Sequence, residues 1–268
     1  MMKIKFNKIF LTISLLILVA CESEEILSPD AGFEEYTVVQ AEIQPGKKFP
    51  AVRITKTLPL GVPYDINKAE LKNVTAYLVK NEVQVIPLLY TTDGLYEPRY
   101  EFYVEEGEIY EIYAEREGKF IYGKTIIPHK PTVTAVSYNV SGYFFDADIQ
   151  TELDEVYSAI WIVSGIPPAR AEDYFSVSIP STTPDKMIAV RTSSIPEEYR
   201  RSIYSGNRYI QTFSFDKSFR KYFYSRTSGQ EINDPFIQGG GAVEWNMHGE
   251  NVIGMFIGVT PGDIINVN

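Results

Sequence analysis

Short runs in which apolar and polar side chains alternate recur along the chain from Tyr36 onward. Alternation with a period of two predicts half-buried β-strands, and the Gly, Pro, Asn and Asp residues between the runs predict turns. A hairpin should join the runs 99–104 and 109–114 through Glu106 and Gly107. Strands are expected in the first half over 36–43, 51–56, 74–79, 83–90, 99–104, 109–114 and 120–127. This number of strands predicts an immunoglobulin-like β-sandwich.

The segment Pro128-His129-Lys130-Pro131 interrupts this pattern. Proline pushes the residue before it out of the helical region, so the segment predicts a stiff boundary between domains. His129 is interpreted as an exposed linker side chain rather than a catalytic base. The mature chain then divides into an immunoglobulin-like β-sandwich over 36–131 and a second β-rich domain over 132–268. In the second domain, strands are expected over 133–140, 143–149, 157–163, 174–179, 242–245 and 252–258.

The second domain also carries signals for one or two short helices. Pro196, the acidic pair Glu197-Glu198 and Gly206 fit the start, first turn and end of one helix. Asp216 could cap a second helix that ends at Gly229. Its aromatic face would consist of Phe215, Phe219, Tyr222 and Phe223. Core packing is the favoured interpretation of this face, with a ligand platform as the alternative. The fold class predicted from these patterns is mainly β.

The first twenty residues have the pattern of a secretory signal. Three lysines in residues 3–8 precede an apolar run over 9–20, which is too short to span a bilayer as a helix. The run ends in Leu18-Val19-Ala20-Cys21, which resembles a bacterial lipobox, and Cys21 is the single cysteine of the chain. We therefore expect a lipoprotein signal over 1–20, a lipid anchor such as palmitate on Cys21, and a tether over 21–35. An ordinary secretory signal with a chance cysteine is the alternative.

The composition of the chain limits the classes of function that we expect it to have. The chain has 25 basic and 35 acidic side chains, and because residues 1–20 hold three Lys and no acid, the remaining 248 residues have a net charge of −13. Such a chain is not expected to bind nucleic acid non-specifically. Residues 22–25 (Glu-Ser-Glu-Glu) fit either a surface-export signal or a solvated spacer.

The sequence lacks a nucleophile elbow, a His-Glu-x-x-His motif, a P-loop and a dinucleotide-binding glycine pattern. With two His and one Cys there are few transition-metal ligands, so we expect no cofactor, no metal and no enzymatic activity. Segment 146–155 is rich in carboxylates and suggests calcium. However, Thr151 and Tyr157 stand where an EF-hand needs Gly and Glu, so an acidic loop is favoured.

One basic segment stands out from the acidic background. The segment from Arg191 to Arg226 has 36 residues, of which eight are basic and three are acidic, so its net charge is +5. Aromatic residues lie between the basic ones. Arg and Tyr are enriched at interface centres, so this segment is a candidate site for a partner protein or an anionic ligand. The alternative is a solvated helix face. The candidate partner-binding residues are Arg200, Arg201, Arg208, Arg220 and Lys221.

Several segments together resemble a known family. They are Cys21 with its acidic follow-on, Val38–Gly46, Arg53–Leu60, and the closing Asp234-Pro235-Phe236 and Trp245–Phe256. They look like the Bacteroidota lipoproteins of domain-of-unknown-function family 4249. The resemblance implies an outer-membrane lipoprotein encoded beside TonB-dependent transporters, with no catalytic residues to carry over. Asn251-Val252 departs from the paired glycine of the commoner form.

These observations predict a lipid-anchored protein of the outer membrane, facing either the cell surface or the periplasm. Its expected role is that of a non-catalytic binding or accessory protein that partners a TonB-dependent transporter in nutrient uptake. One alternative is a stand-alone glycan-binding or adhesin module, which a coplanar row of exposed aromatic rings would favour. Another is a glycoside hydrolase that uses two carboxylates.

Overall fold

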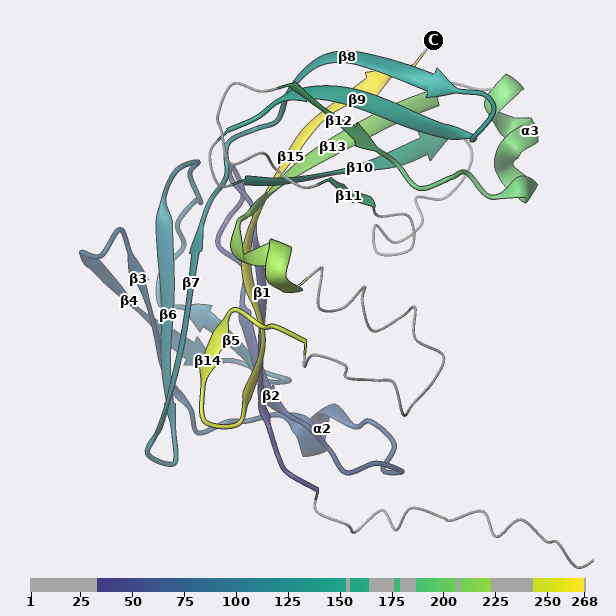
Figure 1. Cartoon of the computed structure of the whole chain (residues 1–268). Helices are drawn as coiled ribbons and strands as arrows, with labels where there is room; N and C mark the ends of the chain where they lie inside the picture. Colours follow the sequence, from purple (N-terminus) through teal and green to yellow (C-terminus); the bar gives the residue numbers. More distant parts are fainter. Residues whose placement is uncertain are drawn as a thin grey trace, which may run out of the picture. The chain divides into compact units, whose positions relative to one another are not determined.

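The computed structural model describes residues 33–152, 155–163, 176–178, 187–205, 208–222 and 243–267, and the structural statements below concern these residues. Residues 35–58 and 63–268 belong to one compact unit, which is mainly β (Figure 1). Residues 59–62 lie outside this unit, and within them the Val62 N–H donates to the Pro59 carbonyl at 3.2 Å.

The strands are β1 Thr37–Ile43, β2 Val52–Lys56, β3 Thr75–Lys80, β4 Gln84–Tyr90, β5 Leu95–Pro98, β6 Ile109–Arg116, β7 Lys119–Ile126, β8 Thr132–Asn139, β9 Phe144–Gln150, β10 Glu155–Val163, β11 Ser176–Ser178, β12 Met187–Arg191, β13 Arg208–Asp216, β14 Met247–Gly249 and β15 Val252–Asn266. The helices are α2 Ile66–Ala69 and α3 Glu197–Ser205, with a further helical turn over 218–222.

The strands form two sheets of unequal size. The large, curled sheet has twelve strands in the order β11-β10-β13-β15-β1-β2-β5-β4-β3-β6-β7-β14. The small sheet has three, in the order β12-β9-β8. This arrangement confirms the predicted mainly β, sandwich-like fold in two parts with few short helices. The finer immunoglobulin-like assignment stays a prediction.

Strand β15 connects the two parts of the large sheet. Its first half pairs in parallel with β1, from Thr37 opposite Val252 to Ile43 opposite Gly258, and its second half pairs antiparallel with β13. Gly254 makes the parallel contact possible, because it has φ +130° and a Cβ there would lie 1.9 Å from the Val39 carbonyl oxygen. Two separate halves of the chain therefore share one sheet.

The buried side chains gather in three clusters. The largest lies under β1–β7 and includes the fully buried Tyr96, Tyr110 and Phe256. A second lies between the small sheet and the strands β10, β13 and β15, around Phe145 and Trp161. A third, smaller cluster includes Phe215 and Val259. Because β15 contributes to all three clusters, burial as well as backbone pairing links the two parts.

The expected hairpin between 99–104 and 109–114 is wrong. Strand β6 pairs with β3 and β7, whereas 99–104 has no regular strand. This segment meets residues 46–49 instead, through the Phe49 N–H to the Phe102 carbonyl at 3.0 Å and the Val104 N–H to the Lys47 carbonyl at 2.9 Å. Its alternation reflects the packing of Phe102 and Val104 against the large core. The strand at this point of the chain is β5, a few residues earlier.

Other expectations are confirmed in outline with shifted bounds. Helix α3 forms where Pro196 and Glu197-Glu198 indicated it, and Asp216 caps the next helical turn by accepting from the Ser218 N–H at 2.7 Å. The strand expected over 242–245 is wrong, because 243–245 are irregular and the strand begins at Met247. The elements that the sequence did not predict are α2, β5, β12, β13 and β14.

The boundary segment 128–131 lies between β7 and β8, as expected. However, β14 pairs with β7 and β15 pairs with β1, so C-terminal strands complete the sheet of the N-terminal half. The division into domains 36–131 and 132–268 stays a prediction.

Candidate functional site

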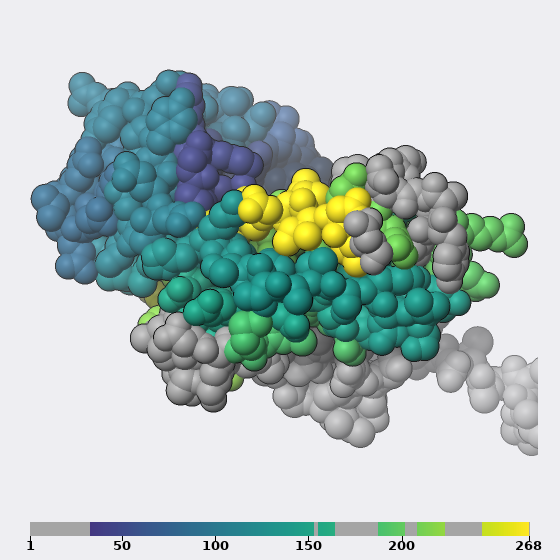
Figure 2. Space-filling view, turned by 90° about the horizontal axis from the view of Figure 1, so that it is seen from above, coloured from purple at the N-terminus to yellow at the C-terminus, as the bar shows by residue number. Residues whose placement is uncertain are grey.

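Three arginines lie over three aromatic rings at the turn between β8 and β9. The distances from guanidinium carbon to ring centroid are 3.9 Å for Arg191–Phe144, 4.1 Å for Arg200–Tyr143 and 5.2 Å for Arg208–Tyr138. These six residues form the arginine–aromatic cluster. The arginines come from the end of β12, from α3 and from the start of β13, so the fold gathers them from three elements. Figure 2 views the surface formed by β8 and β9, in teal, with β15 in yellow beside it.

Further contacts fix two of these guanidinium groups. Arg191 donates to both carboxylate oxygens of Asp146, at 2.9 and 3.4 Å, and the Arg200 Nε–H donates to the Ile195 carbonyl at 3.2 Å. The Arg191 side chain is still 56% exposed. Because a cation over a partly exposed ring contributes only about 0.5–1 kcal/mol, the cluster can exchange these contacts for those of a partner.

The structure separates the five predicted partner-binding residues into two groups. Arg200 and Arg208 belong to the arginine–aromatic cluster, and the exposed Arg201 follows Arg200 on α3. Arg220 and Lys221 follow the other end of β13, which spans about 26 Å at roughly 3.3 Å per residue. Lys221 lies 3.7 Å from the Glu244 carboxylate there. The five residues therefore do not form one surface.

The predicted aromatic face is present at this second location. Phe215 stacks on Phe219 at 4.4 Å, Phe219 contacts Tyr222 at 5.7 Å, and Tyr222 contacts Trp245 at 5.3 Å. Phe215 is a buried core residue and Phe219 packs against the same cluster, which fits the core-packing interpretation. Phe223 lies outside the described residues.

The carboxylates of the acidic segment 146–155 point to different partners. Asp146 pairs with Arg191, Asp148 is exposed, and Glu155 is buried against His129. Among the described residues, no three His, Cys, Asp or Glu side chains form a group that could hold a metal ion. Asp154 lies outside the described residues, so the calcium alternative stays open.

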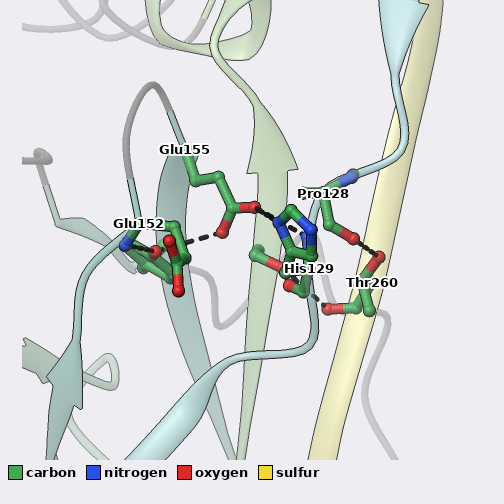
Figure 3. Close-up of polar contacts among 7 residues, drawn as sticks. Pro128, His129, Glu152, Glu155 and Thr260 are labelled. Atoms are coloured by element: carbon green, nitrogen blue, oxygen red, sulfur yellow. Dashed lines mark hydrogen bonds and ion pairs between the residues drawn. The ribbon is translucent and has the colours of Figure 1, made fainter. Parts of the chain in front are cut away.

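Glu155 makes several hydrogen bonds where the chain passes from β7 to β8 (Figure 3). Its Oε1 accepts from the His129 backbone N–H at 2.6 Å and lies 3.2 Å from His129 Nδ1. Its Oε2 accepts from the Tyr157 hydroxyl at 3.0 Å. Burial raises the pKa of Glu155, although the His129 and Tyr157 hydrogen bonds oppose that shift. A buried carboxylate beside a histidine thus fixes the backbone of the boundary segment.

Two hydroxyl groups near this carboxylate also bind backbone groups of the boundary segment. The Thr260 hydroxyl donates to the Pro128 carbonyl at 2.5 Å (Figure 3). The Ser214 hydroxyl donates to the His129 carbonyl. The His129 side chain is 61% exposed, as predicted for a linker residue. Because both hydroxyls are used on backbone carbonyls, the arrangement is a structural network that attaches 128–131 to β13 and β15.

A row of aromatic rings crosses four strands of the large sheet. Tyr77 on β3, Tyr113 on β6, Tyr122 on β7 and His248 on β14 have successive centroid distances of 5.3, 5.0 and 6.3 Å. Coplanar rings side by side would lie further apart than 5.3 Å, and the interplanar angle of 12° for the first pair is that of stacked rings. Tyr77 and Tyr113 therefore cover each other's faces, and Tyr113 is tilted by 49° against Tyr122, so the row is not a flat, coplanar platform for a sugar.

A shallow groove of about 520 Å³ lies beside the boundary segment. Its charged residues are Glu105, Glu106, Lys130 and Asp263, and the exposed ring of Tyr103 forms part of one wall. Lys130 and Asp263 of its lining form a salt bridge of 2.7 Å. This ion pair engages the single basic residue of the lining, whereas Glu105 and Glu106 are exposed.

Several predicted features lie outside the described residues. They are the signal segment 1–20, Cys21, the tether up to residue 32, Arg226 and Gly229. The described helices include none that is both long and apolar enough to cross a membrane. The sequence suggested Arg200 and Arg208 as partner-binding residues but not Arg191, because β12, the strand that places Arg191 opposite Asp146, was not predicted.

Comparisons with known proteins give no family assignment. No protein-family model and no curated protein matches the chain. Two solved structures described as cytokine receptor complexes, crystal forms 1A and 2, are 9% identical to it, with TM-scores of 0.24 and 0.25. The first match covers 70% of this chain and 86% of the other, and the second covers 69% and 92%. Likeness this low carries no argument about fold or function.

Proposed function

We propose that this protein is a lipid-anchored, non-catalytic accessory protein of the outer membrane that binds a TonB-dependent transporter through the arginine–aromatic cluster. The cluster is the observation that carries the proposal. It combines the two side-chain types enriched at interface centres, and its members stay partly exposed around one hairpin. The sequence Leu18-Val19-Ala20-Cys21 supports the anchor, and the family resemblance supports the choice of partner.

Two further observations support a binding role. The buried carboxylate Glu155 and the hydroxyls of Ser214 and Thr260 hold backbone groups, so the described polar cluster near His129 serves the fold. Tyr77 stacks on Tyr113, and Tyr113 is tilted against Tyr122, so these rings do not form the coplanar row that would favour a glycan-binding module. The immunoglobulin-like character of the N-terminal part stays a prediction, because its seven strands β1 to β7 are neighbours in one sheet.

Detergent extraction of the native protein under mild conditions tests the proposal. The transporter should co-purify with the wild type, and the double variant Arg200→Glu, Arg201→Glu should lose it, because reversed charge disrupts a basic interface. Lys221→Glu is the matched control, since it reverses a charge at the other end of β13. Thermal unfolding of each variant checks the fold.

A wild-type protein that elutes without a transporter would refute the partnership. Equal loss with Lys221→Glu would place the interface elsewhere. Separately, Cys21→Ala should release the protein from the membrane fraction, whereas the Arg200 and Arg201 variant should stay in it. Retention of Cys21→Ala in the membrane fraction would refute the lipid anchor.

A further inference from the structure

Strand β8 forms one edge of the small sheet. It has eight residues and pairs with β9 on one side. Among the described residues, no backbone pairs with its other side. In an edge strand, alternate residues direct their N–H and C=O groups outward, and these groups can bind another extended backbone.

The other described edges of the two sheets are short or protected. Strands β11 and β14 have three residues each, and β12 lies near β11. Beyond β14, side chains cover the edge of β7, because the Ile126 N–H donates to Asp216 Oδ2 at 2.7 Å and Asn246 Nδ2 donates to the Lys124 carbonyl at 3.4 Å. Within the described part of the chain, side chains thus block strand addition at β7, whereas the outer side of β8 has no backbone partner.

The sequence of β8 also favours strand addition. Its residues, Thr-Val-Thr-Ala-Val-Ser-Tyr-Asn, include no charged side chain and no proline, which are the residues that commonly block an edge. The pairing with β9 has one irregularity, between Val133 and Ala135, and is regular from Ala135 to Asn139. Val133, Val136 and Tyr138 pack on the core, whereas Ala135 and Ser137 are exposed. The strand is therefore held rigidly on its inner face.

We propose that β8 accepts an extended segment of a partner polypeptide as an added strand next to the arginine–aromatic cluster. This inference rests on the proposed function, and it names the edge through which the transporter binds. Tyr138, near the end of β8, is the ring under Arg208, so the edge and the cluster form one continuous surface. Main-chain hydrogen bonds would then supply affinity, and the cluster would supply specificity.

Charge indicates the chemistry of the added segment. Asp148 on β9 is exposed and lies opposite the small Ala135. A residue added opposite Ala135 would lie about 9.6 Å from Asp148, two strand spacings, and a Lys or Arg side chain can cover that distance. A second copy of this chain that offered its own β8 is a poorer occupant, because that strand has no basic side chain to place near Asp148. The occupant is therefore an extended partner segment that carries a basic residue opposite Ala135.

Photocrosslinking of the native complex tests this inference. The photoreactive residue p-benzoylphenylalanine replaces Ser137 in one variant and Phe120, an exposed residue of β7, in a second. The Ser137 probe should crosslink to one extended segment of the transporter, and the Phe120 probe should not. Ser137→Lys, assayed separately by co-purification, should lower transporter recovery by about tenfold, whereas Phe120→Lys should leave it unchanged.

The other outcomes separate the two proposals. Crosslinks to the transporter from Phe120 but not from Ser137 would keep the proposed function and overturn β8 as the edge. A crosslink from Ser137 to a second copy of the chain would also overturn it. Absence of the transporter from both crosslinking experiments and from the co-purification would refute the proposed function and this inference together.

Discussion

Burial and hydrogen bonding act in opposite directions on individual carboxylates in this protein. Burial raises the pKa of Glu155, and its hydrogen bonds from His129 and Tyr157 do not compensate fully. At Glu108, burial also raises the pKa, but hydrogen bonds from Lys80 and Tyr110 outweigh it and hold the pKa below its ordinary value. These two residues should therefore make stability depend on pH with opposite signs.

Replacement of Glu155 by Gln should improve stability relative to the wild type as the pH rises from 4 to 8. Because the folded-state pKa of Glu155 is raised, its contribution is present below the unfolded pKa of about 4.5 and is lost as the pH rises through the folded value. Gln keeps a hydrogen-bond acceptor for His129 without a charge. Urea unfolding at several pH values measures the difference.

Glu108→Gln is the control with the opposite sign. Its lowered pKa means that Glu108 stabilises the fold above its unfolded pKa and loses this effect as the pH falls. The Gln variant should thus be weakest at neutral pH and approach the wild type on acidification. If the stability of both variants relative to the wild type changed with pH in the same direction, the opposite pKa shifts assigned to Glu155 and Glu108 would be wrong.

At the scale of elements, β15 carries the longest set of backbone contacts, and its approach to β1 depends on Gly254. A Cβ at this position would overlap the Val39 carbonyl and lie within 2.9 Å of the Val39 nitrogen. Gly46 also has a positive φ, of 73°, but nothing lies within 4 Å of its would-be Cβ. Alanine substitutions at these two glycines would therefore separate the free-energy cost of a strained backbone conformation from that of a steric clash.

Gly254→Ala should destabilise the protein by about 3 kcal/mol or more, because strand separation adds to the strain of a positive φ. Gly46→Ala should cost only about 1–2 kcal/mol, the strain alone. Chemical denaturation of both variants measures these free energies of unfolding. Equal losses would mean that β1 and β15 tolerate a side chain between them.

Local alternation predicted most strands because the side-chain period is a local property. The alternation wrongly predicted a strand over 99–104. There, Phe102 and Val104 pack inward from an irregular segment that forms backbone hydrogen bonds with 46–49. It also missed β13, whose basic and aromatic residues suggested an interface although Ile210 and Phe215 are buried. Composition pointed to Arg200 and Arg208, but no local pattern could show that β8 and β9 bring rings beneath them.

At the scale of the whole molecule, the two parts of the fold share structural elements. Strands β14 and β15 complete the sheet of the N-terminal half. The side chains of Asp216 and Asn246 bind backbone groups of β7, and the side chain of Glu155 binds the backbone of the boundary segment. These contacts join residues more than twenty positions apart in sequence. The N-terminal half should therefore depend on the C-terminal half for its stability.

A fragment of residues 33–131 should fail to fold cooperatively, because it leaves β1 without β15 and exposes the edge of β7. The longer chain 33–268 should show one unfolding transition that includes both parts. Circular dichroism during thermal unfolding compares the two. A stable, cooperative fragment would show that the predicted domain boundary at 128–131 separates independent domains.

The parallel pairing of β1 with β15 also determines how the molecule bears mechanical load. The proposed anchor precedes the N-terminus of β1, whereas the arginine–aromatic cluster lies in the part that the second half of β15 joins. Tension between membrane and partner would pull β1 and β15 in opposite directions along their axes. The hydrogen bonds of seven paired positions would then resist shear together instead of opening one at a time.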